Sequence, residues 1–203
     1  MNGCNGERFV LLVASSGVLW LLPQPALAHL VTTGLGPVYD GISHFLMSFE
    51  DLLPVAAMAL LGGLNGPVGA RRALFVLPAA WLLGGLGGVV TGLAPLPGVA
   101  TALSALVLGG LVAADRRLSP ASLTVLAAAV GLLHGWLNGA GITAANREAL
   151  ALLGIGGAVF VIVALLAALA ASLQAQPARI AARVAGSWIA AVGLLLVGWQ
   201  LRG

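Results

Sequence analysis

Residues 149–173 read ALALLGIGGAVFVIVALLAALAASL, a run without a single charged side chain. A helix of about 20 predominantly apolar residues is long enough to cross the hydrocarbon core of a bilayer. Charged side chains are too costly to place at random in that core, so their absence over such a length is informative. The run therefore predicts a membrane-spanning helix, and it decides the fold class of the chain.

The composition of the whole chain supports the same class. Of 203 residues, 60% are hydrophobic and 7% are charged, and the mean hydropathy is +1.07. A soluble domain carries about 25% charged residues because its surface must be wetted. The net charge of +3 does not indicate a nucleic-acid partner, because the chain has no lysine and its nine arginines are scattered singly and in pairs. We therefore predict an all-α polytopic membrane helix bundle whose partner is the lipid bilayer.

Glycine, proline and arginine divide the chain after residue 28 into six apolar segments. A short helix over 37–47 precedes the first, and Ser48 is expected to cap the next helix in a Ser-x-x-Asp arrangement with Asp51. Residues 29–203 are thus predicted to form one six-helix transmembrane domain. Its spans are expected near 48–64, 73–93, 97–114, 119–140, 149–173 and 179–201.

Residues 1–28 have the pattern of a secretory signal peptide. Arg8 gives a positive start, an apolar run FVLLVASSGVLWLL follows, and Ala26-Leu27-Ala28 is a small-residue cleavage site. Cleavage would leave His29 as the mature N-terminus. An uncleaved signal anchor is the alternative interpretation of the same segment.

The arginines predict the orientation of the spans. Six of them fall in alternate turns between the predicted spans, and the positive-inside rule places such turns in the cytoplasm. Both mature termini are then periplasmic, and a signal peptide delivers His29 to that same side. We expect the bacterial inner (cytoplasmic) membrane. The six arginines are Arg71, Arg72, Arg116, Arg117, Arg179 and Arg183.

The few other ionisable residues gather in two places, and the first is YDGISHFLMSFEDLLP at the start of the first span. If this stretch is helical, Asp40 and His44 are i,i+4 neighbours on one face. Asp51 returns to that face seven residues after His44, while Glu50 is offset by about 100°. Ionisable groups in membrane segments usually mark function, so all four are candidate site residues.

The second cluster lies in GLLHGWLNGAG of the fourth span. His134 and Asn138 are again i,i+4, and Gly135 and Gly139 would let another helix approach closely. With the span ending near residue 140, His134 is expected roughly 9 Å below its outer end. The two clusters are therefore predicted to meet at one depth on the periplasmic side.

These residue types suit a metal ion. His, Asp, Glu and Asn give the mixed nitrogen and oxygen donors that nickel, cobalt, copper or zinc accept. A processed His29 would add an amine and an imidazole. The only cysteine, Cys4, lies in the predicted signal peptide, so no thiolate site is expected. Structural alternatives stay open: helix capping for Glu50 or Asp51, interhelical hydrogen bonds for His44 and His134, and a solvated terminus for His29.

With these motifs, the chain resembles the HupE/UreJ family of bacterial membrane proteins. The family's first motif is a histidine, five residues and then Asp-His; here His44 is followed by five residues and Glu50-Asp51. The second motif is Phe-His-Gly, two residues, His-Gly, one residue and Glu. His134, Gly135 and Gly139 match it, and the departures are Leu133 for phenylalanine, Asn138 for histidine and Gly141 for glutamate.

The resemblance implies a nickel or cobalt permease or a metal-uptake accessory. Two imidazoles and one carboxylate of the family pattern are missing, which implies a weaker or differently selective site, and Asp40 is a candidate compensating ligand. The predicted metal residues are His29, Asp40, His44, Glu50, Asp51, His134 and Asn138.

The predicted function is binding of a divalent transition metal at the periplasmic side, followed by transport or transfer to a metalloprotein or membrane-complex partner. The alternative is a noncatalytic membrane subunit or assembly factor that packs against a larger complex. An enzyme is not expected, because the chain lacks a Gly-x-Ser-Gly nucleophile motif and a His-Glu-x-x-His motif. It also lacks a Gly-x4-Gly-Lys phosphate loop, so it would not hydrolyse ATP itself.

Overall fold

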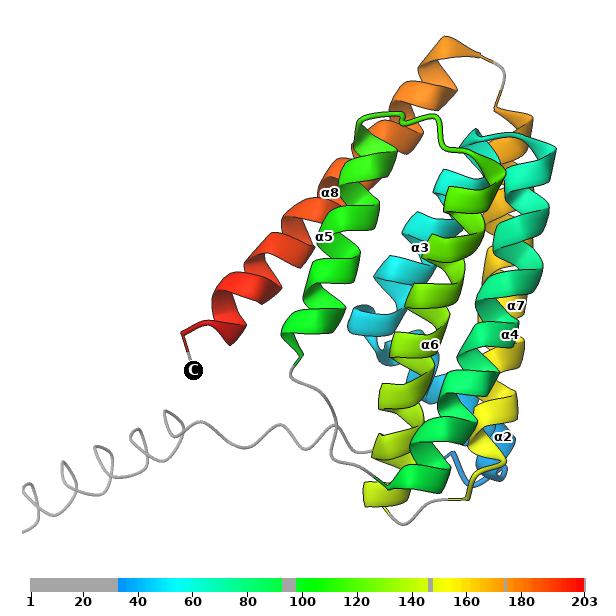
Figure 1. Ribbon diagram of the computed structural model, residues 1–203, viewed down its shortest axis with the longest axis vertical. Coiled ribbons are helices and arrows are strands. Elements are labelled where there is room, and N and C mark those ends of the chain that lie inside the picture. Colours follow the sequence, from blue (N-terminus) through cyan, green and yellow to red (C-terminus); the bar gives the residue numbers. More distant parts are fainter. Residues whose placement is uncertain (1–32, 93–97, 146–147, 174, 203) are drawn as a thin grey trace, which may run out of the picture.

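The computed structural model describes residues 33–92, 98–145, 148–173 and 175–202. Within these ranges the chain is entirely helical, which confirms the predicted fold class (Figure 1). The predicted signal peptide, its cleavage site and His29 lie outside the described residues. The helices are α2 (Pro37–Met47), α3 (Phe49–Leu64), α4 (Pro67–Thr91), α5 (Val99–Ala113), α6 (Pro120–Ala144), α7 (Ala151–Ser172) and α8 (Gln176–Gln200).

Proline and glycine set several helix ends. Pro67 and Pro120 stand at the start of α4 and α6, where the missing N–H has no helical partner to lose. The side chain of Ser119 caps α6 by accepting a hydrogen bond from the Ser122 N–H at 3.1 Å. Gly92 ends α4 in the left-handed conformation, with φ of 57°.

Four helices are long and apolar enough to cross a membrane: α4, α6, α7 and α8. The α2–α3 pair counts as a fifth only if its 77° bend is accepted within one span. At 15 residues, α5 is about 22 Å long, shorter than a hydrocarbon core of about 30 Å. The described residues therefore support four to five spans, and the predicted count of six is not established.

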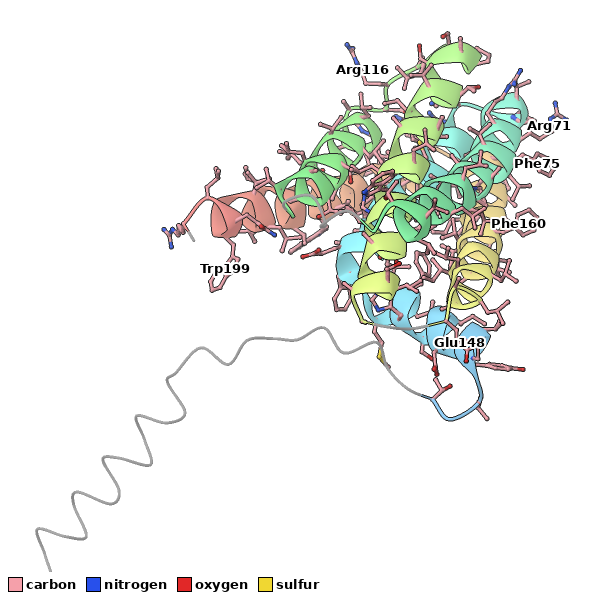
Figure 2. The ribbon with its side chains drawn as sticks, turned by 60° about the horizontal axis from the view of Figure 1, so that its bottom comes forward. Arg71, Phe75, Arg116, Glu148, Phe160 and Trp199 are labelled. Atoms are coloured by element: carbon pink, nitrogen blue, oxygen red, sulfur yellow. The ribbon has the colours of Figure 1, made fainter. Side chains whose placement is uncertain are left out.

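The two ends of the bundle differ in charge. The α3–α4, α5–α6 and α7–α8 connections lie together at one end, which we call the arginine end because all six arginines of the predicted cytoplasmic turns lie there (Figure 1). Figure 2 shows Arg71 and Arg116 far from Glu148, which lies beside α2 at the opposite end. The predicted segregation of arginine is therefore present in the fold.

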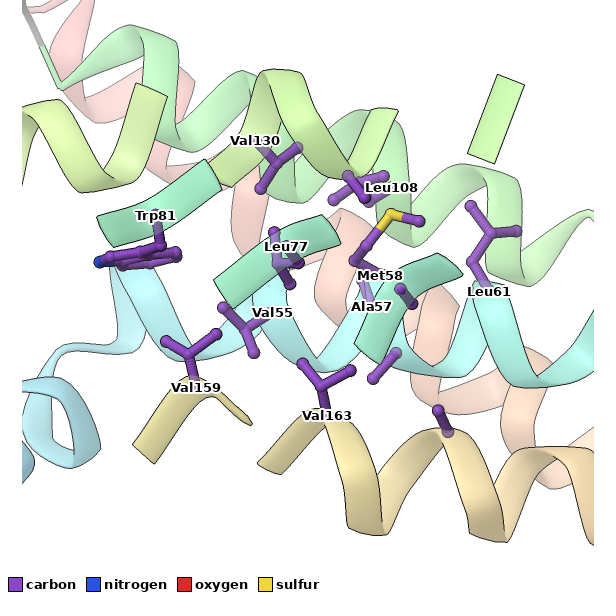
Figure 3. Close-up of a cluster of buried hydrophobic side chains, with 14 of the residues drawn as sticks. Val55, Ala57, Met58, Leu61, Leu77, Trp81, Leu108, Val130, Val159 and Val163 are labelled. Carbon is purple, nitrogen blue, oxygen red and sulfur yellow. The ribbon is translucent and has the colours of Figure 1, made fainter. Parts of the chain in front are cut away.

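Helix α3 lies at the centre, and its apolar side chains meet those of four other helices (Figure 3). Around α3, α4 packs along α6, α5 packs along α8, and α7 contacts α2, α3 and α4. The site described below is built where α3, α4, α5 and α6 approach one another. Labelled core residues in Figure 3 include Val55, Met58, Leu61, Leu77, Trp81, Leu108, Val130, Val159 and Val163.

The α4–α6 contact is a backbone-to-backbone contact. A methyl group added at Gly135 would overlap the carbonyl oxygen of Trp81, and one added at Gly139 would overlap that of Gly85. This confirms the prediction that these glycines admit another helix, and it identifies that helix as α4. Small residues promote such packing in membranes because close backbone approach replaces the missing hydrophobic drive.

Candidate functional site

The break between α2 and α3 brings Asp51 into the bundle. Ser48 occupies the position before α3 with extended backbone angles, φ −85° and ψ 95°. Ser48 is the N-cap residue of α3 as predicted, but it makes no side-chain capping hydrogen bond, so that part of the Ser-x-x-Asp prediction is wrong. Asp51 instead directs its carboxylate toward α6 and is only 6% exposed.

His134 is the centre of the cluster and is completely buried. Its Nδ1 lies 2.8 Å from Oδ1 of Asp51, and its Nε2 lies 2.8 Å from Oγ of Ser104 on α5. The ring also stacks on Trp81 of α4, with centroids 5.4 Å apart and planes inclined by 27°. Three neighbouring helices therefore fix the orientation of one imidazole.

Asn138 completes the cluster one turn along α6. Its Nδ2 donates to Oδ2 of Asp51 at 3.0 Å and to the carbonyl oxygen of His134 at 2.9 Å. Its Oδ1 is buried and has no hydrogen-bond partner among the residues that the structure describes. A buried acceptor without a donor is costly, and such atoms call for a ligand, an ion or a water molecule.

The structure thus brings together Asp51, His134 and Asn138 of the predicted set, and the other members lie elsewhere. Asp40 accepts hydrogen bonds from the backbone N–H and hydroxyl of Thr33 at 2.6 and 2.7 Å. Glu50 is exposed, whereas His44 is half-buried. Asp40 and His44 are i,i+4 neighbours in α2 as predicted, but the prediction that Asp51 returns to their face is wrong, because the 77° bend separates α2 from α3.

The cluster also lies deeper than predicted. Because α6 continues to Ala144, ten residues follow His134, and the ring lies about 15 Å below the end of the helix. Glycine, proline and arginine divide the apolar segments, so the sequence predicts the end of this span near residue 140, between Gly139 and Gly141. In the structure the glycines continue the helix, and the site lies near the middle of α6.

Two residues of the cluster, Ser104 and Trp81, were not predicted from the sequence. Ser104 is one of two hydroxyl residues in the otherwise apolar α5, and its Oγ also lies 2.7 Å from the carbonyl oxygen of the other, Thr101. Serine commonly makes such a bond within its own helix, so its type and position gave no signal of a distant partner. Trp81 is buried, and its Nε1 has no hydrogen-bond partner within the described part of the chain.

The cluster offers a small and mixed set of donor atoms. Asp51 supplies a carboxylate, His134 an imidazole, Asn138 an amide oxygen and Ser104 a hydroxyl. Across the described ranges, no three His, Cys, Asp or Glu side chains are grouped as a metal site would require. Asp51 and Asn138, which replace histidines of the HupE/UreJ motifs, contact each other directly. The two departures therefore form one altered part of the cluster.

Comparison with known proteins agrees with the motifs. A search of curated proteins finds no match, and neither does a search of solved structures. The family model described as HupE / UreJ protein matches residues 17–196, which is most of the chain and includes every residue of the cluster. The chain therefore belongs to the HupE/UreJ family.

Proposed function

We propose that this protein binds a divalent transition metal ion as its substrate at Asp51, His134 and Asn138. It would then carry the ion across the membrane or pass it to a partner protein. The observation that supports this most is the buried, unpaired Oδ1 of Asn138 beside a carboxylate and an imidazole. A cation would satisfy that oxygen, and membership of a family linked to nickel and cobalt uptake makes a transition metal the natural candidate.

The spacing of the donors suits a shared ion. Metal–nitrogen and metal–oxygen bonds to such ions are about 2.0–2.2 Å long, so two adjacent ligands lie about 3 Å apart. The Asp51 Oδ1 to His134 Nδ1 distance is 2.8 Å. An ion could therefore replace the bond between these atoms with little backbone movement, and rotation of the Asn138 amide would offer its oxygen.

The donor set also suggests the strength of binding. One imidazole with oxygen ligands binds nickel, cobalt, copper or zinc less firmly than the several imidazoles of the family motifs. No thiolate is present in residues 29–203. We therefore expect a site that binds reversibly, as transport or transfer requires, and that discriminates modestly among these metals.

The approach to the site would run from the end opposite the arginines. In the orientation that we propose, the arginine end faces the cytoplasm of a bacterium and α2 lies at the periplasmic surface. The half-buried imidazole of His44 on α2 makes no hydrogen bond within the described residues, so it is available to an ion approaching from that side. His29 would lie on the same side after cleavage of the signal peptide.

The test is metal content of the purified, signal-processed protein, measured by elemental analysis after incubation with nickel, cobalt, copper or zinc. We expect about one ion per parent chain, and an affinity reduced 10-fold or more in Asp51→Ala and His134→Ala variants. Glu50→Ala is the matched control, because Glu50 is adjacent in sequence but exposed. Equal binding by the parent and a D51A/H134A double variant would contradict the proposal.

One observation favours the alternative of a noncatalytic membrane subunit. Asp51, His134, Ser104 and Asn138 already bond to one another, as a purely structural interhelical network would. Under this alternative the parent protein holds no metal and copurifies with a stoichiometric membrane partner. N-terminal sequencing of the same sample shows whether His29 is the mature terminus.

A further inference from the structure

Helices α5 and α8 form one closely packed pair, which we call the α5–α8 arm (Val99–Ala113 and Gln176–Gln200). A methyl group added at Gly109 would lie 2.5 Å from the backbone nitrogen of Ala190, and one at Gly193 would lie 2.5 Å from that of Leu106. Contacts this close leave no room for sliding between the two helices. The arm is therefore a unit that moves as a whole.

The arm packs loosely against α6. A cleft of about 260 Å³ separates α5 from α6, and α5 contacts α6 far less than it contacts α8 or α3. Among the glycines of the described residues, none brings the α5 and α6 backbones together, and Gly110 of α5 faces open space. The cleft walls are apolar except for Ser104; they include Leu103 and Val107 of α5, with Leu126, Ala129 and Val130 of α6.

The arm is held at the arginine end. Arg117 of the α5–α6 connection donates to the Leu64 carbonyl oxygen at 3.0 Å, and the Leu118 N–H donates to Oδ1 of Asn65 at 2.8 Å. Arg179 pairs with Asp115 at 2.6 Å, which ties the start of α8 to the same connection. Toward the opposite end, α5 and α8 lean away from the other helices (Figure 1).

Away from that end, a single side-chain hydrogen bond joins α5 to α6 within the described residues: Ser104 Oγ to His134 Nε2, at 2.8 Å. Elsewhere the two helices face each other across apolar side chains and the cleft. Lipid tails are as apolar as leucine, so exchanging protein for lipid along this seam costs little free energy. Relative to α6, the position of the arm therefore depends on the Ser104–His134 bond together with the packing of α5 on α3.

We infer that the α5–α8 arm is a gate that pivots at the arginine end, and that Ser104 is the positioning residue that holds it closed against His134. The inference rests on the proposed function only for the signal that closes the gate. The cleft is not the path of the ion, since its walls are apolar. Its volume increases when the arm pivots away from α6 and decreases when the arm pivots back.

Proton counting connects the gate to the metal. The hydroxyl of Ser104 has one proton, which it can donate either to the Thr101 carbonyl oxygen or to His134 Nε2. A metal ion on Nδ1 fixes the ring proton on Nε2, as metal-bound histidines require of their second nitrogen. His134 Nε2 then donates to the Ser104 hydroxyl, which donates its own proton to the Thr101 carbonyl oxygen. The two acceptors no longer compete for the single Ser104 proton. Metal binding should therefore tighten the closed position.

The experiment measures distances between spin labels on cysteines introduced at exposed leucines, after Cys4→Ser removes the only native cysteine. The pair Leu103 and Leu132 spans the α5–α6 seam. The matched controls are Leu103 with Leu194, inside the arm, and Leu86 with Leu132, inside the α4–α6 pair; all four leucines are exposed. Diamagnetic zinc is the metal, and its binding is measured on the same samples.

We expect the Leu103–Leu132 distribution to be broader than either control without metal and to narrow with zinc. Ser104→Ala should keep this distance distribution broad with and without zinc, and Ser104→Thr, which retains the hydroxyl, should restore the narrowing by zinc.

A Leu103–Leu132 distance distribution as narrow as the controls and unchanged by Ser104→Ala would overturn the gate. If zinc binds but leaves the parent distribution unchanged, the metal-linked gate is likewise overturned while the proposed function stands. If zinc does not bind, but the parent distribution is broader than both controls and broader still in Ser104→Ala, the gate stands and the proposed function fails.

Discussion

Helix α6 meets its two neighbours in opposite ways. Against α4, Gly135 and Gly139 place one backbone directly on the other. Against α5, the same helix faces an apolar cleft that one serine hydroxyl crosses. His134 lies between these two seams, stacked on Trp81 of α4 and bonded to Ser104 of α5. The imidazole thus lies between α4, which packs tightly on α6, and α5, which packs loosely on it.

The contrast follows from how helices associate in lipid. No hydrophobic drive pushes them together there, so close backbone contact and polar bonds decide which seams are tight. The α4–α6 seam has close backbone contact, whereas the α5–α6 seam depends on a single polar bond. A binding site placed between a rigid and a loose seam can keep its ligand geometry while one side opens.

The largest effect is expected from Gly135→Ala, which attacks the tight seam. The added methyl group would overlap the Trp81 carbonyl oxygen, a backbone atom that cannot move away cheaply. We expect a loss of about 3 kcal/mol in the free energy of unfolding, measured in detergent by thermal or denaturant unfolding. Gly110→Ala is the matched control, since its added methyl group meets nothing within 4 Å. Equal stability of the two variants would show that the α4–α6 seam is not rigid.

The next effect concerns the cluster between the seams. Asp51→Ala removes the acceptor of bonds from His134 and Asn138, which leaves His134 Nδ1 buried without a partner and Asn138 Nδ2 with only its bond to the His134 carbonyl oxygen. A broken buried pair costs 3–5 kcal/mol in soluble proteins, but polar contacts in membranes average nearer 0.6, so we expect about 2 kcal/mol. Unfolding of Asp51→Ala, Glu50→Ala and the parent in one detergent checks this. Glu50→Ala should match the parent, and a loss as large as that of Asp51→Ala would contradict the assignment of the buried carboxylate.

The sequence predicted the parts of this arrangement that depend on local pattern. The short helix over 37–47 and the helix ending at 64 were predicted with the bounds that the structure has, to within one residue. The meeting of Asp51 with His134 and Asn138 was also predicted, because few polar residues interrupt the apolar segments and each is costly to bury alone.

The remaining features depend on tertiary contacts. Helical periodicity assumes a straight axis, so the bend at Ser48 removed Asp40 and His44 from the face of Asp51. Gly139, close to which α6 was predicted to end, instead serves the contact with α4. Ser104 could not be identified because a serine in an apolar helix usually bonds its own backbone, as it also does here.

A smaller effect is expected when the loose seam is filled. Ala129 of α6 lines the cleft, so Ala129→Phe should occupy part of its volume. Protein then replaces lipid at little net gain, and stability should change by less than about 1 kcal/mol. Without metal, the Leu103–Leu132 distance distribution should nevertheless become narrower, because the bulky ring restricts the movement of the arm. Ala168→Phe, on the exposed face of α7, is the matched control and should leave the distribution unaltered. An equal response of both variants would show that the cleft does not govern the seam.

The smallest effect is expected at the pivot of the arm. The hydrogen bond from Arg179 holds the pKa of Asp115 below its ordinary value of 3.8, against the opposing effect of burial. A lowered pKa means that the ion pair contributes its full stability above the ordinary pKa and loses it as pH falls through the lowered value. The pair is partly exposed, so Asp115→Asn should cost less than about 1 kcal/mol in the free energy of unfolding.

That cost should be constant between about pH 5 and pH 8 and shrink under stronger acid, when the parent carboxylate is protonated too. Denaturant unfolding of the parent and Asp115→Asn at several pH values measures it. The backbone contacts of Arg117 and Leu118 also hold the pivot, so the Leu103–Leu132 distribution should stay near that of the parent. If Asp115→Asn broadened that distribution as much as Ser104→Ala, the closed position of the arm would depend on the Arg179–Asp115 pair rather than on the bond to His134.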